Sequence, residues 1–251
     1  MSGRAGRAWQ AAWRWSVARW WGERPGRAGL FLLGLSVPVA GFVLAGPAAA
    51  SDPSAAADLR RLVGVGAAVA ALWVAGGIAS GPWREGQIVW WLQKTGRAAD
   101  FLAARVALDG ALVTLAVLLW TAALAVGTAA FGDGVAWDLF RSLPARILLI
   151  YLIVCWTALL SAAGVARDSE LAALTLILAA VRGVLFPRLP DGVDAALGWI
   201  LPPLGGVADA SAALARADLW TALEAARAPL AFIAVTSVAA LWLAGRRTPG
   251  T

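Results

Sequence analysis

The sequence predicts an all-α integral membrane protein with six transmembrane helices. Hydrophobic residues make up 61% of its 251 residues and charged residues only 14%, which is a balance outside the range of soluble globular domains. Six mainly apolar stretches each approach the roughly 20 residues that a helix needs to cross the hydrocarbon core. Because lipid offers the backbone no hydrogen-bond partner, each span must be helical or shielded by protein.

Residues 28–251 are predicted to form one transmembrane domain. Its spans are expected at about 28–50, 62–82, 106–131, 145–166, 171–187 and 228–245. Pro38 lies in the middle of the first span and should kink it. The apolar run of the fifth span contains one charge, Arg182.

Residues 1–27 are predicted to form a cytoplasmic amphipathic helix that lies in the membrane interface. At about 100° per residue, one arc of this helix collects most of its tryptophans and the opposite arc collects arginines. The tryptophans expected to anchor it are Trp9, Trp13, Trp20 and Trp21. Indole rings favour the headgroup level and arginines favour anionic lipid. The alternative is an ordinary basic segment that only fixes the topology.

The segment 81–105, between the second and third spans, is too polar to lie in lipid and too apolar for a free loop. Ile88, Trp91 and Leu92 recur at helical spacing, so one face can pack on the membrane or on a partner. We therefore predict a helical hairpin at the cytoplasmic surface.

The stretch between the fifth and sixth spans is predicted to contain re-entrant or interfacial helices on the outer side. It is uncharged from Ala195 to Ala208 and contains Pro202 and Pro203, which makes it too short and too interrupted to cross a bilayer. A helix at about 210–226 is expected to return the chain to the sixth span.

The charges predict the orientation in the plasma membrane. With both ends cytoplasmic, the inner segments hold thirteen Lys and Arg against six Asp and Glu, and the outer segments hold eight against nine. This distribution follows the positive-inside rule, so we expect a multi-pass protein with cytoplasmic termini. The net charge of +6 is thereby explained better by membrane insertion than by nucleic-acid binding.

Several chemistries are excluded by the residue inventory. The chain has no histidine, which removes Ser/His proteolysis, the H-E-x-x-H zinc motif and bis-histidine haem ligation. Its only lysine, Lys94, is not part of a phosphate-binding loop, and Cys155 is its only cysteine. We therefore predict no catalytic residue, cofactor or metal site in this chain, and ATP-driven work would need another chain.

Arg105 and Asp109 are the candidate polar pair within the membrane domain. They are four residues apart at the start of the third span and so share a helix face. The simpler interpretation is an interfacial ion pair that extends to the lipid headgroups, and the alternative is a contact in a substrate path.

The segment after the second span carries a recognisable pattern. Its successive parts are Arg84-Glu85-Gly86, Trp90-Trp91-Leu92, Arg97 and the run Asp100-Phe101-Leu102-Ala103-Ala104-Arg105. Together with the surface helix, six spans and two outer helices, this pattern resembles the permeases of ABC transporters of the type-2 exporter class. The proline common at the turn is replaced here by Lys94-Thr95-Gly96, and a frequent glycine by Ala104, which leaves the register of the segment open.

The resemblance implies a permease subunit that forms the substrate path of an ATP-driven exporter. It implies separate ATPase subunits that carry ATP and Mg²⁺, and a second permease copy in a homodimer or heterodimer. The residues implied to couple to the ATPase are Arg84, Glu85, Gly86, Trp91 and Arg97. The main alternative is a membrane anchor or scaffold subunit that transports nothing. An ion-coupled transporter is disfavoured because no inverted repeat or midplane ionisable cluster is visible.

Overall fold

The computed structural model describes residues 13, 53–79, 81, 86, 97–129, 135–185 and 190–246. Every regular element within these ranges is an α-helix, so the predicted all-α class is confirmed for this part of the chain. The helices are α3 (Pro53–Ala75), α6 (Ala98–Ala129), α7 (Val135–Arg141), α8 (Leu143–Ala162), α9 (Asp168–Leu185), α10 (Asp191–Ile200), α11 (Leu204–Ala215) and α12 (Leu219–Arg246).

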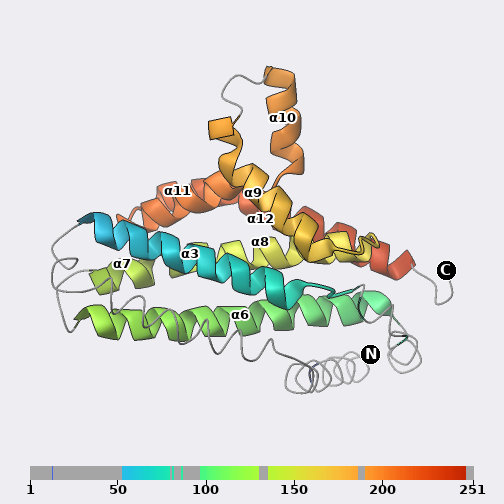
Figure 1. The fold of residues 1–251 in the computed structure, drawn as a ribbon, viewed down its shortest axis with the longest axis horizontal. Helices are drawn as coiled ribbons and strands as arrows, with labels where there is room; N and C mark the ends of the chain where they lie inside the picture. The colour runs from blue at the N-terminus through green and yellow to red at the C-terminus, as the bar shows by residue number, and fades with distance from the viewer. Residues whose placement is uncertain are drawn as a thin grey trace.

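Four long helices, α3, α6, α8 and α12, run along the longest axis of the molecule (Figure 1). Helix α9 leaves one end of this bundle obliquely, and α10 projects away from the bundle. Helix α11 packs on α12 and α8. Both α3 and α8 reach the end of the bundle where α6 begins, so chain segments far apart in sequence meet there (Figure 1).

Helix α8 is the centre of the bundle because its sequence is apolar on every side. The consecutive residues Leu152, Ile153 and Val154, together with Ile150, have no exposed surface. A helix that is hydrophobic all round is stable only when other helices surround it. Accordingly, α8 contacts α3, α6, α7, α9, α11 and α12.

Three helices of the described part are long and apolar enough to cross a membrane: Ala98–Val126, Leu139–Ala162 and Leu219–Arg246. They correspond to the spans predicted at 106–131, 145–166 and 228–245, and each begins earlier than predicted. Helices α3 and α9 lie where the second and fifth spans are predicted, but the apolar part of α3 covers only Arg61–Ala75 and α9 carries three charges in 18 residues. The predicted span at 28–50 lies outside the described residues.

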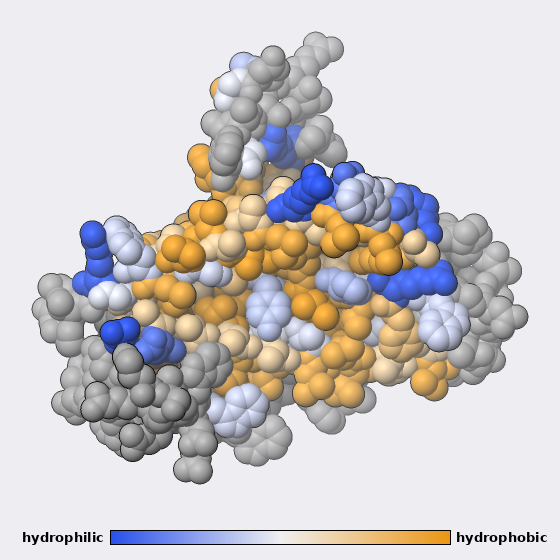
Figure 2. Space-filling view, turned by 180° about the vertical axis from the view of Figure 1, so that it is seen from behind, coloured by the Kyte–Doolittle hydropathy of each residue, from blue (hydrophilic) through white to orange (hydrophobic). Residues whose placement is uncertain are grey.

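The surface of the bundle is compatible with a lipid environment. Figure 2 shows a broad hydrophobic area across its middle, with hydrophilic residues gathered toward the ends. Large exposed apolar side chains include Leu115 and Leu119 on α6 and Val235 and Val238 on α12. Exposed apolar areas of this kind mark membrane or protein contacts. Together with the three long helices, they are compatible with a membrane protein.

Two predicted boundaries around the segment 81–105 are wrong. Helix α3 ends at Ala75 rather than at residue 82, because Gly77 adopts a φ of +68°, which favours glycine and stops the helix. Residues 98–105, predicted as part of a helical hairpin at the cytoplasmic surface, are the first turns of α6. This part of the segment is therefore continuous with the third predicted span.

The predicted helix at 210–226 is also wrong, because the chain turns sharply after α11. The Ala217 N–H donates to the Leu214 carbonyl at 3.0 Å and the Asp218 N–H to the Ala213 carbonyl at 3.0 Å. These two bonds form a Schellman motif, and they place Ala217 at a φ of +60°. The predicted break at Pro202 and Pro203 does separate α10 from α11.

Pro229 lies inside α12 without ending it. A proline has no N–H for the carbonyl four residues earlier, here that of Ala225. This carbonyl faces Gly206 of α11: a Cβ at Gly206 would lie 2.6 Å from the Ala225 oxygen and 3.0 Å from Pro229 Cδ. The close approach of α11 to α12 therefore requires glycine at position 206.

The turn after α11 predicts that Ala217→Gly stabilises the protein. Alanine at positive φ costs about 1 kcal/mol relative to glycine, so the midpoint of thermal unfolding in detergent should rise. The matched control is Ala212→Gly within α11, which should lower the midpoint because glycine weakens a helix interior by about 0.5–1 kcal/mol. Equal shifts of the same sign for the two variants would contradict the assigned turn.

The start of α12 predicts a pH dependence. The Thr221 hydroxyl donates to Asp218 Oδ2 at 2.6 Å and its N–H to Oδ1 at 3.1 Å, and these bonds hold the pKa of Asp218 below its ordinary value of 3.8. A depressed folded-state pKa stabilises the fold above pH 3.8, and the contribution is lost as the pH falls below it. Asp218→Asn should therefore unfold at a lower temperature than wild type at pH 6, with the difference closing in more acidic buffer.

Candidate functional site

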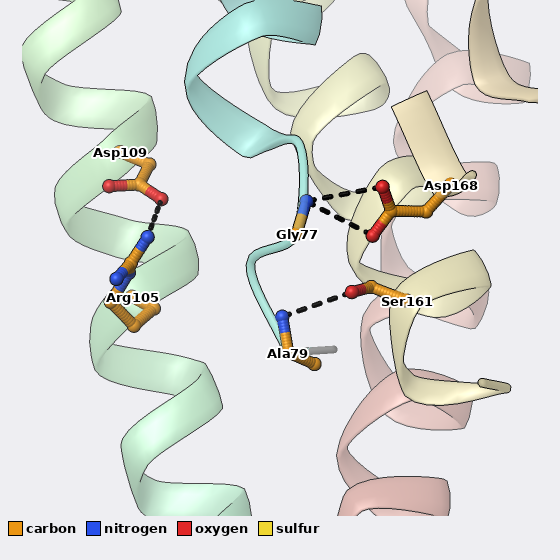
Figure 3. Close-up of polar contacts among 6 residues, drawn as sticks. All are labelled: Gly77, Ala79, Arg105, Asp109, Ser161 and Asp168. Carbon is orange, nitrogen blue, oxygen red and sulfur yellow. Dashed lines mark hydrogen bonds and ion pairs between the residues drawn. The ribbon is translucent and has the colours of Figure 1, made fainter. Parts of the chain in front are cut away.

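The candidate site lies where the end of α3, the beginning of α6 and the turn between α8 and α9 meet (Figure 3). Helix α3 contacts α6, α8 and α9. The chain leaving α3 here leads into the segment predicted to couple to an ATPase, and α6 returns from that segment.

Asp168, the first residue of α9, holds the turn that follows α3. The Gly77 N–H donates to both carboxylate oxygens of Asp168, each at 3.1 Å, and the Ser169 N–H donates to Oδ1 at 2.7 Å. Asp168 is only 3% exposed. Burial of a carboxylate is costly unless it is hydrogen-bonded, and bonds from N–H groups to a charged oxygen are among the stronger ones. The contact joins residues 91 positions apart.

Ser161 makes a second contact to the same turn. The Ala79 N–H donates to the buried Ser161 hydroxyl oxygen at 3.0 Å (Figure 3). Helix α8 ends just beyond Ser161 in a Schellman motif, with Gly164 at a φ of +89°. That turn brings the chain back to Asp168, so one tight corner supplies both acceptors.

We call Gly77, Ala79, Ser161 and Asp168 the polar junction. It satisfies two backbone N–H groups that lie beyond the end of α3. A Cβ at Gly76 would lie 3.3 Å from the Ser169 side chain, so the two segments are also closely packed. The polar junction therefore fixes the position and direction of the chain as it leaves α3.

The predicted pair of Arg105 and Asp109 does form. Arg105 Nη2 lies 3.1 Å from Asp109 Oδ2 within α6. Arg105 is 6% exposed and Asp109 is fully covered, so the pair lies inside the protein and does not extend outward as the simpler interpretation expected. Helix α6 packs against α3, α8 and α12. The ion pair therefore lies at the same end of the bundle as the polar junction (Figure 3).

The structure places three of the other predicted site residues. Gly86 and Arg97 are exposed, and Gly86 has a φ of +68°. Trp13 is helical, and its side chain is exposed as an interfacial anchor requires. The remaining predicted residues lie outside the described part of the chain: Arg84, Glu85, Trp91, Trp9, Trp20 and Trp21.

Sequence reasoning missed a buried arginine at the other end of the bundle. Arg146 of α8 is 3% exposed, and it donates to the Thr121 hydroxyl at 3.1 Å and to the Ser142 hydroxyl at 2.8 Å. The Ser142 hydroxyl donates in turn to the Leu139 carbonyl at 3.1 Å. The sequence pattern that could have indicated this contact is Ser142 four residues before Arg146, at the start of an uncharged run.

Sequence reasoning also missed the polar junction. Asp168-Ser169 before an apolar run is a helix-start pattern and could have identified the acceptor. The donor could not be identified in this way, because any backbone N–H can donate.

Acidic and sulfur-containing side chains do not gather into a metal site in the described ranges, where no three His, Cys, Asp or Glu residues cluster. Cys155 of α8 is buried and accepts a hydrogen bond from the Ser237 hydroxyl at 3.2 Å, which ties α8 to α12. The contacts described at the candidate site are hydrogen bonds and an ion pair.

Comparison with known proteins assigns no family: the chain matches no protein-family model, and no curated protein matches it. The resemblance to exporter permeases remains a prediction from the sequence pattern.

The buried ion pair predicts unequal effects of single and double substitutions. Asp109→Ala leaves the Arg105 guanidinium without its carboxylate, and breaking a buried pair costs about 3–5 kcal/mol. The double variant Arg105→Met/Asp109→Leu removes both charges and should unfold within about 1 kcal/mol of wild type. Unfolding in mixed micelles measures both. A double variant as unstable as Asp109→Ala would contradict this account of the pair.

Proposed function

We propose that this chain is the transmembrane permease subunit of an ATP-driven exporter in the plasma membrane. It works with separate ATPase subunits that bind ATP and Mg²⁺, and with a second permease copy. In this proposal the chain crosses the membrane six times, both termini are cytoplasmic, and residues 1–27 lie in the inner interface. The segment containing Arg84, Glu85, Gly86, Trp91 and Arg97 docks on the ATPase.

The observation that carries the proposal is the length of α6. Its 32 residues span about 48 Å at 1.5 Å per residue, whereas the hydrocarbon core is about 30 Å thick. The excess includes Asp100 to Arg105, which is part of the pattern that resembles the exporter permeases. A force applied beside Arg97 would pass directly into the membrane because no break separates this segment from the span.

The position of the polar groups supports the same proposal. The polar junction and the Arg105–Asp109 pair hold both chain ends of the docking segment at one end of the bundle. A segment that must transmit a conformational change needs rigid attachments, because interfaces transmit force by discrete rearrangement rather than by continuous deformation.

The docking assignment predicts that exchanging the charges of Arg84 and Glu85 prevents ATPase association. The tagged chain is isolated from its native membranes, and the ATPase that accompanies it is identified by its phosphate loop. Arg84→Glu/Glu85→Arg should reduce the recovered ATPase and its stimulated turnover by at least about tenfold, since opposed interface charges cost a few kcal/mol.

The matched control is Arg227→Glu/Glu224→Arg on α12. These two side chains form an exposed pair, 3.8 Å apart, in the part of α12 predicted to face outward. ATPase recovery should remain at the wild-type level. Unchanged recovery in both charge-exchanged variants would show that residues 84 and 85 do not form the docking surface.

A scaffold subunit and a permease differ in how they respond to ATP. ATP binding by the partner would leave the helix bundle of a scaffold unchanged, whereas a permease must alternate between conformations. Spin labels at Leu115→Cys on α6 and Leu174→Cys on α9 distinguish the two, because both side chains are exposed. Cys155→Ser removes the native thiol. A distance distribution that changes with ATP and vanadate supports the permease, and a constant one supports the scaffold.

A further inference from the structure

We propose that Asp168 and Ser161 are positioning residues that transmit movement of the chain leaving α3 to α8 and α9. The inference rests on the proposed function, in which force enters through the segment after α3, and it assigns a second route into the bundle besides α6. The juxtaposition that carries it is the Gly77–Ala79 turn bonded to the α8–α9 corner.

The hydrogen bonds of the polar junction connect the backbone after α3 to two different helices. Asp168 belongs to α9 and Ser161 to α8, and both accept from N–H groups of one three-residue stretch. Backbone N–H groups are fixed to the path of the chain, so this stretch cannot move without breaking the bonds or moving the corner. Because Asp168 is a buried carboxylate, losing the bonds from Gly77 would remove part of the hydrogen bonding that offsets its burial.

The corner is itself stiff. The Val165 N–H donates to the Leu160 carbonyl at 3.1 Å and the Gly164 N–H donates to the Ser161 carbonyl at 3.0 Å, so Ser161 is held by the same motif that ends α8. Beyond the corner, the Trp156 indole N–H donates to the Thr175 hydroxyl at 2.8 Å, which ties α8 to α9 one step further along. Movement of the corner would therefore move α8 and α9 together.

Close packing adds a steric component to the polar one. Gly76 lies against Ser169, where an added Cβ would approach to 3.3 Å, while Gly64 of the same helix has open space at its Cβ position. These two glycines provide a matched pair: Gly76→Ala should push the end of α3 away from α9, and Gly64→Ala should not.

The first experiment needs no partner. Amide hydrogen exchange is measured on the full chain in lipid nanodiscs for wild type and for Ser161→Ala/Asp168→Ala. Exchange at residues 76–79 should rise about tenfold or more in the double variant, because loss of a hydrogen bond to a charged group lowers the free energy of local opening. Gly76→Ala should produce a rise at the same residues.

Two controls separate the junction from general destabilisation. Glu170→Ala removes an exposed acid from the same turn and should leave exchange at residues 76–79 at the wild-type level. Asp168→Asn keeps one acceptor oxygen and should restore part of the protection lost in Asp168→Ala. If the double variant does not fold, exchange at residues 76–79 is compared between wild type and the single variants Asp168→Asn and Gly76→Ala. Wild-type exchange at residues 76–79 in these variants would overturn the proposal.

The second experiment tests transmission. The labelled pair Leu115→Cys and Leu174→Cys, in the Cys155→Ser chain, is combined with the ATPase and with Ser161→Ala/Asp168→Ala. The ATPase should still be recovered, but the change of distance with ATP and vanadate should be lost. A change of wild-type size would overturn the proposal, as would loss of ATPase association, which would place these residues in the docking surface. If the wild-type chain recovers no ATPase, the proposed function fails. The exchange measurement then tests by itself whether Ser161 and Asp168 hold the chain at residues 76–79.

Discussion

Every backbone N–H and C=O group that lies in lipid must find its partner within the protein, and this requirement explains how the helices end. Helices α8 and α11 end in the same pair of backbone hydrogen bonds. Helix α3 ends differently, because Gly77 directs its N–H to Asp168 of a distant helix. The polar junction thus satisfies backbone N–H groups through distant side chains, whereas α8 and α11 do so through their own carbonyls.

The two buried arginines show how the bundle distributes its charges. Arg105 lies near the polar junction with a carboxylate on its own helix, and Arg146 lies toward the opposite end among hydroxyl groups. Between them, α8 buries Ile150, Leu152, Ile153 and Val154 completely. Charged groups in membrane domains are tolerated where protein covers and bonds them. Among the described residues, the buried charged side chains therefore lie near the ends of the bundle.

The sequence was sufficient to predict the all-α class and the three long apolar helices of the described residues, because long apolar runs have no other stable form in lipid. It was sufficient for the Arg105–Asp109 pair as well, since a spacing of four residues is a local property of a helix. Helix ends were less predictable. Gly76-Gly77 could have indicated the end of α3, but Ala217 carries no signal of the positive φ that ends α11. The bond between Gly77 and Asp168 depends on packing across 91 residues and has no local pattern.

The contact between Gly206 and the Pro229 region of α12 has a consequence for how the sequence can change over time. A larger residue at position 206 would collide with the Ala225 carbonyl and the proline ring. Replacing Pro229 alone would let the Ala225 carbonyl regain its helical hydrogen bond and would remove the ring atoms that pack near Gly206. Either change by itself damages the contact, so the two positions are expected to vary as a compensating pair in related chains. A co-varying glycine and proline spaced 23 positions apart would thus be a genetic signature of α11 lying against α12.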